Sequence, residues 1–173
     1  YYTVRMPHAA VFRGRHLALG GLTPLTPIPG METKSAFAGD ISAITAARLA
    51  PWAEKHLFEP GAEITRMADW QQKLDAIVAR TRDRDLTLLT GLPNAMLQLA
   101  AAVMADAAAS GQRLAHLQER WPKLECFMHT GIPVGPYYDE LRAVLGPKVN
   151  FHEVYAAAEG YIAVQDRSEE HTS

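Results

Sequence analysis

From residue 86 onward, short apolar runs alternate with stretches of helical character, and this alternation restricts the possible folds more than any other feature. Residues 86–90, 124–128 and 150–155 have the length and the apolar or aromatic content of strands, and Gly or Pro residues lie close to each run. Helical stretches over 95–109 and after Gly135 separate them. This order is typical of parallel strands joined by right-handed crossovers. We therefore predict an α/β fold with a parallel-type sheet and crossover helices.

Weaker signals predict further elements in the first half of the chain. The clearest helix starts near Trp70, because Leu74, Ile77 and Val78 follow it at the spacing of one buried helical face. Asp69 precedes this helix and suits its first turn. The other expected elements are β runs over 1–5 and 11–19, a helix from 41 capped by Asp40, a helix restarted by Pro51, and a short helix over 113–121.

Composition narrows the functional classes. The 173-residue chain is 48% hydrophobic and 21% charged, which is ordinary for one globular domain. The formal net charge is −2, so no basic surface indicates a nucleic-acid partner. No apolar run approaches the ~18 residues of a membrane span and no signal peptide is evident, so we expect no membrane partner and a cytoplasmic location. The single cysteine, Cys126, lies in an apolar run and is expected to be buried rather than nucleophilic.

The two ends of the sequence suggest a fragment. The chain starts without Met, and residues 167–173 form a polar, aperiodic tail that looks like the translation of a sequencing adapter. We expect residues 1–166 to be an internal piece of a larger domain and residues 167–173 to be non-native.

The candidate ligand-binding residues lie where the predicted strands end. In parallel sheets ligands bind at the carboxyl ends of the strands, which here are residues 90–93, 129–131 and 155–160. The last segment places the ring of Tyr155 and the carboxylate of Glu159 around small residues, a combination that suits a base and a phosphate-bound Mg²⁺. A plain strand–loop–strand connection with a solvated Glu159 explains the same residues. The sequence has no zinc spacing, no G-x-S-x-G elbow and no complete phosphate loop.

Five segments together resemble a known family. They are AGDIS at 38–42, the stretch from RD at 84–85 to GLPN at 91–94, WPKLE at 121–125, HTG at 129–131, and residues 155–166. Their order and spacing are similar to those of the bacterial acyl acid–amido synthetases of the auxin-responsive promoter family. These enzymes belong to the adenylate-forming superfamily, so the resemblance implies the middle of the large amino-terminal domain of such an enzyme.

The resemblance also implies an activity and a site. ATP and Mg²⁺ would convert a carboxylic acid into an acyl-adenylate, and an amine such as an amino acid would then displace AMP. By resemblance, Tyr155 with the small residues Ala156, Ala157 and Ala158 would flank the adenine, with Thr130 and Gly131 on its other face. Glu159 would act in catalysis by binding Mg²⁺, and the acyl pocket would be lined by Gly91, Asn94, Met96, His129 and Ile132.

The sequence departs from the family at one position and leaves two alternatives open. Ala158 stands where the family has Ser or Thr, which removes a hydroxyl expected to contact phosphate. The phosphate loop is expected before Tyr1, and the ribose-binding Asp and the carboxy-terminal domain are expected after Asp166, so the isolated chain is expected to be inactive. An acyl-CoA ligase of the same superfamily and a non-catalytic binding or interaction fold are the alternatives.

Overall fold

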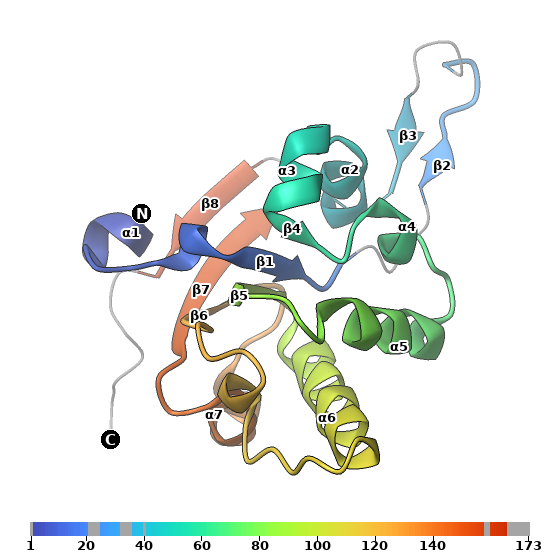
Figure 1. Ribbon diagram of the computed structural model, residues 1–173. Helices are drawn as coiled ribbons and strands as arrows, with labels where there is room; N and C mark the ends of the chain where they lie inside the picture. The colour runs from blue at the N-terminus through green and yellow to red at the C-terminus, as the bar shows by residue number, and fades with distance from the viewer. Residues whose placement is uncertain (1, 21–24, 32–35, 40, 158–159, 166–173) are drawn as a thin grey trace.

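A mixed, mostly parallel sheet forms the centre of the protein. The computed structural model describes residues 2–20, 25–31, 36–39, 41–157 and 160–165. Within them six strands pair in the order β4-β1-β5-β6-β7-β8, and each neighbouring pair is parallel except β7 and β8 (Figure 1). The strands are β1 (Arg15–Ala18), β4 (Phe58–Glu59), β5 (Leu86–Gly91), β6 (Cys126–His129), β7 (Asn150–Ala157) and β8 (Gly160–Val164). This arrangement confirms the predicted α/β class.

Three helices pack against one face of the sheet and build the main core. They are α5 (Trp70–Thr81), α6 (Pro93–Ala109) and α7 (Tyr138–Leu145), and Figure 1 shows them together on one side of the strands. The predicted buried face of the helix that starts at Trp70 is confirmed, because Leu74, Ile77 and Val78 are all buried. Asp69 caps α5, accepting a hydrogen bond from the Gln72 amide at 2.7 Å.

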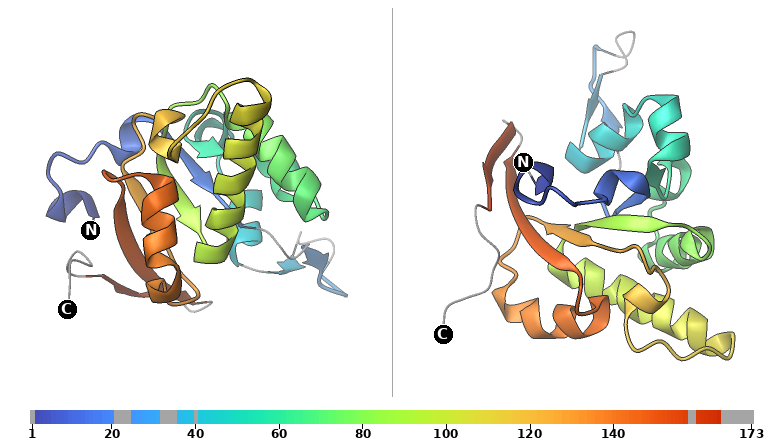
Figure 2. Two further views of the ribbon diagram at one scale, coloured as in Figure 1. Left: turned by 90° about the horizontal axis from the view of Figure 1, so that it is seen from below. Right: turned by 60° about the vertical axis from the view of Figure 1, so that its left-hand side comes forward.

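The opposite face of the sheet has a thinner cover. The short helix α1 (Tyr2–Arg5) and the 3-10 turn η1 (Val11–Arg13) lie there, as the right-hand view of Figure 2 shows. Val11 packs with Leu88 and Cys126 in a small second core. The carboxylate of Glu125 fixes this segment by accepting the Ala10 amide at 2.7 Å and the Tyr2 hydroxyl at 3.2 Å.

The segment between β1 and β5 forms a cap beside the edge strand β4. It contains the helices α2 (Ile41–Ala47), α3 (Pro51–His56) and α4 (Ala62–Thr65). The strands β2 (Thr26–Pro27) and β3 (Phe37–Ala38) pair in antiparallel fashion and project from the body of the molecule (Figure 1). The helices expected near 41 and 51 are present, while Asp40 itself lies outside the described residues.

Three predicted elements differ in the structure. Residues 2–5 form helix α1 rather than a strand, because they pair with no strand and are fixed instead by the Tyr2 side chain. The strand expected over 11–19 begins only at Arg15, after the turn η1. The helix expected over 113–121 is reduced to the 3-10 turn η3 (Leu117–Glu119), where Glu119 accepts the amide of Ala115 at 2.8 Å and caps the turn locally.

No helix in the described part of the chain is long and apolar enough to span a bilayer. The one long helix that is rich in apolar residues, α6, contains 17 residues and packs against the sheet.

Two phenylalanines provide a matched test of the core. Phe127 is fully buried in the middle of β6, whereas Phe12 in η1 is 75% exposed. We expect Phe127→Ala to lower the free energy of unfolding by about 3–5 kcal/mol, because it removes buried surface and leaves a cavity. Phe12→Ala should change it by less than about 0.5 kcal/mol. Urea unfolding followed by circular dichroism measures both, and equal losses would contradict this assignment of the core.

Candidate functional site at the carboxyl edge of the sheet

The parallel register brings the predicted strand ends to one edge. Gly91 at the end of β5 lies opposite His129 at the end of β6, and His129 lies opposite Glu153 of β7. The chain leaving β1 joins the same edge, since the Leu19 amide donates to the Thr90 carbonyl at 2.8 Å. The segments that the sequence singled out after β5, β6 and β7 are therefore neighbours in space.

Two glycines allow the loops at this edge to pack closely. A Cβ on Gly91 would lie 3.0 Å from the Cβ of Leu19, so the strand end is tightly covered. Gly131 has a φ of +87°, and a Cβ there would lie 2.7 Å from a methyl carbon of Leu92. Position 131 therefore favours glycine for its backbone conformation, and a side chain there would also push the end of Leu92 aside. Its backbone is exposed, so it can approach a flat ligand closely.

His129 ends β6 inside the protein. Its side chain is fully buried between aromatic rings, with ring centroids 5.6 Å from Phe127 and 6.4 Å from Phe151. Burial, and secondarily the nearby His152, lower the pKa of His129 to about 4. The imidazole is therefore neutral at pH 7 and supports the site from below rather than offering a charge to a ligand.

The other residues predicted for the adenine and acyl-acid site beside these loops lie at different depths. Asn94 at the start of α6 is exposed, and Thr130 and Ile132 are half-buried in the loop after β6. Met96 is fully buried in the main core. Met96 thus packs inside the protein beneath the carboxyl edge, while Asn94, Thr130 and Ile132 are at least partly exposed there.

The segment that the resemblance places beside the adenine is a hairpin, in which β7 extends further than predicted. Ala156 and Ala157 were expected to start the loop, but both belong to β7, because they pair with Tyr161 and Gly160 of β8. The Tyr155 side chain is 57% exposed. Ala158 and Glu159 lie outside the described residues. The described residues hold no cluster of three or more His, Cys, Asp or Glu that fits a metal, so Mg²⁺ at Glu159 stays a prediction.

Sequence reasoning missed a polar pair close to this edge. The Nε2 atom of His16 in β1 lies 2.6 Å from the hydroxyl of Thr90 in β5, and burial lowers the pKa of His16 to about 4. The two residues are 74 positions apart, so no spacing rule could have joined them. Only the pairing of β1 with β5 brings them together.

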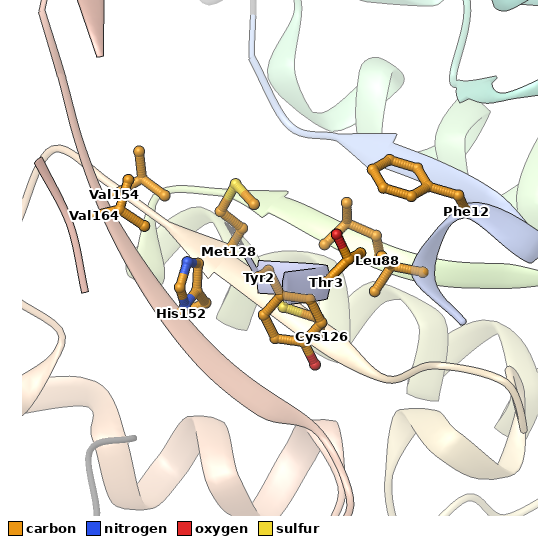
Figure 3. Close-up of a pocket in the computed structure, with 10 residues that line it drawn as sticks. Tyr2, Thr3, Phe12, Leu88, Cys126, Met128, His152, Val154 and Val164 are labelled. Atoms are coloured by element: carbon orange, nitrogen blue, oxygen red, sulfur yellow. The ribbon is translucent and has the colours of Figure 1, made fainter. Parts of the chain in front are cut away.

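A separate pocket of about 260 Å³ lies on the thinly covered face of the sheet. Figure 3 shows Tyr2, Cys126, Met128 and His152 around it. Burial raises the pKa of the Cys126 thiol to about 12, which agrees with the expected buried, unreactive cysteine. The rings of Tyr2 and His152 meet edge to face, with centroids 5.4 Å apart.

No protein-family model matches this sequence, and no curated protein matches it either.

The lowered pKa of the buried His129 predicts that the folded protein loses stability in acid. His129 has a folded-state pKa of about 4 against an ordinary value of 6.5, so the unfolded chain binds the proton more tightly. The free energy of unfolding should therefore fall as the pH drops from 6.5 to 4. His129→Gln should reduce this slope, whatever its effect at pH 7. Urea unfolding at several pH values measures the slope, and an NMR titration of His129 with a midpoint near 6.5 would contradict the prediction.

Proposed function

We propose that this chain forms one wall of the ATP and acyl-acid site of an acyl acid–amido synthetase. Such an enzyme would adenylate a carboxylic acid and transfer the acyl group to an amine such as an amino acid. The observation that carries the proposal is the carboxyl edge, where Gly91, the loop at Thr130–Gly131 and Tyr155 lie on neighbouring strands. These residues belong to three of the segments that resemble the family.

The geometry suits a planar nucleotide base. Gly131 offers exposed backbone in a conformation that a side chain would disturb, and Tyr155 offers an exposed ring at the end of the adjacent strand. Backbone amides and carbonyls can recognise the polar edges of adenine, while the ring stacks on its face. In the proposal, Thr130 and Ile132 extend this surface toward the acyl acid.

The proposed chemistry asks the protein chiefly to position two anions. A carboxylate is a poor acyl donor because oxide is a poor leaving group, whereas AMP leaves readily. Mg²⁺ supplies positive charge at the phosphates when it is bound, and Glu159 is the proposed ligand. The neutral His129 adds no charge at this edge. In the proposal, the negative charge of the carboxylate and the phosphates is therefore offset by the metal and by backbone amides.

Pyrophosphate exchange tests the function on the intact protein that contains this segment. With ATP, Mg²⁺ and a panel of carboxylic acids, labelled pyrophosphate should be incorporated into ATP. Amino acids should then yield an amide, and coenzyme A in their place separates the ligase alternative. If no acid supports exchange and calorimetry detects no binding of Mg-ATP, the adenylation proposal fails and the non-catalytic alternative gains support.

Gly131 offers a sharp test of the base-binding loop. We expect Gly131→Ala to reduce the exchange rate at least about tenfold, because the new Cβ would displace Leu92 and strain the loop. Gly135→Ala is the matched control, since a Cβ there meets open space. Steady-state exchange kinetics measure both variants, and equal rates would argue against a role for the loop.

Tyr155 offers a test of stacking. We expect Tyr155→Ala to raise the KM for ATP by about tenfold, since stacking on an aromatic side chain contributes about 1–3 kcal/mol per base. Ile162→Ala is the control, because Ile162 on the neighbouring strand β8 is equally exposed, at 57%. A KM for ATP that is unchanged by Tyr155→Ala would remove this residue from the site.

A further inference from the structure

A buried carboxylate with three arginines lies at the edge strand β4. The Glu59 side chain is completely buried. Its Oε1 atom contacts Arg15 Nε at 2.7 Å and Arg84 Nε at 3.4 Å, and its Oε2 atom contacts Arg80 Nε at 2.5 Å. Three guanidinium groups thus share the two oxygens of one carboxylate.

Arg15 has a structural role in this cluster. It donates from Nη1 to the Lys55 carbonyl at 2.9 Å and from Nη2 to the Phe58 carbonyl at 2.9 Å. These bonds join the end of α3 to β4, and the Arg15 side chain is only 14% exposed. Its hydrogen-bonding capacity is therefore largely used inside the protein.

Arg80 and Arg84 differ from Arg15 in exposure and in the atoms they use. Both contact Glu59 through Nε, and their side chains are 40% and 47% exposed. In the described part of the chain, no side-chain hydrogen bond involves their terminal Nη atoms. Each guanidinium therefore has N–H donors beyond its Nε–H group on a side chain that is partly exposed.

The local charge favours an anion. Glu54 is a second carboxylate in this region, and its Oε1 accepts the Ala62 amide at 2.7 Å. A Cβ on Gly61 would lie 3.5 Å from both Glu54 Oε1 and Arg80 Nη2, so Glu54 belongs to the same neighbourhood. Three guanidinium groups contact the one buried carboxylate of Glu59, while Asp85, next to Arg84 in the chain, pairs with Lys123 at 2.6 Å. A partly desolvated positive excess of this kind lowers the energy of a bound anion.

We propose that the terminal Nη–H groups of Arg80 and Arg84 bind a phosphate group. Phosphate fits because the planar guanidinium fork donates parallel hydrogen bonds to its oxygens, and Glu59 orients both forks from beneath. The site lies near the start of β5, since Arg84 precedes Leu86, and Gly91 marks the other end of this strand. It shares no residue with the candidate site at the carboxyl edge, and it stands whether or not the proposed synthetase activity is correct.

NMR titration of the chain tests the site directly. Inorganic phosphate and phenyl phosphate are titrated separately, each against sodium chloride at matched ionic strength, while the arginine Nε–H resonances are followed. The signals of Arg80 and Arg84 should shift and saturate with phosphate but not with chloride. Tighter binding of phenyl phosphate would identify a phosphate monoester as the ligand, and tighter binding of the inorganic ion would identify free phosphate.

Matched variants locate the binding. Arg84→Gln should weaken phosphate binding about tenfold, which corresponds to the loss of a hydrogen bond to a charged group. Arg84 has the longest contact with Glu59, so its removal should leave the fold intact in a circular dichroism melt. Arg82→Gln is the control, because Arg82 is similarly exposed but pairs with Asp106 at 2.5 Å. Shifts that chloride reproduces, or equal weakening by Arg82→Gln, would overturn the proposal.

Discussion

The parallel pairing of β1, β5, β6 and β7 determines where the connecting helices and the carboxyl ends of these strands lie. Parallel neighbours cannot be joined by a tight turn, so each connection has to cross one face of the sheet. The α5, α6 and α7 helices belong to those crossings and bury one face. The same pairing places every carboxyl end at one edge, which is why Gly91 and His129 become neighbours although 38 positions separate them. Site geometry at this edge is thus a consequence of strand direction.

The two faces of the sheet are covered unequally, and the difference has a chemical consequence. Phe127 and Phe151 face the crossover helices and are deeply buried. Cys126 and His152 face the segment that contains α1, where a pocket remains. His129 belongs to the crowded face, so its lowered pKa reflects tight packing around an imidazole. In the proposed function, recognition at the carboxyl edge is therefore assigned to backbone groups and to Tyr155, because His129 is neutral at pH 7.

Local sequence patterns predicted the elements whose burial follows their own periodicity. The strand at 86–90 and the helix from Trp70 were predictable because each carries its apolar residues at the spacing its geometry requires. Residues 2–5 were not, because their β-favouring side chains find no strand to pair with, and the Tyr2 hydroxyl is bound by Glu125 instead. Of the candidate site, the sequence predicted the strand ends and missed the depth of Met96 and His129, which depends on which face each residue joins.

The cluster of Glu59 with Arg15, Arg80 and Arg84 could not be predicted from the sequence for a different reason. Arg15, Glu59 and Arg80 lie far apart in the chain, and each alone looks like an ordinary surface residue. They meet because β4 pairs with β1 and α5 packs nearby, so the cluster exists only after the fold has formed. Burying a carboxylate at an edge strand is costly unless cations accompany it, and removing one partner would leave a charge uncompensated. A two-residue strand makes few ladder hydrogen bonds, and the contact of Arg15 with Glu59 adds to the backbone pairing of β4 with β1. Arg15 also donates to carbonyls of Lys55 and Phe58 and is 14% exposed, whereas the side chains of Arg80 and Arg84 are 40% and 47% exposed.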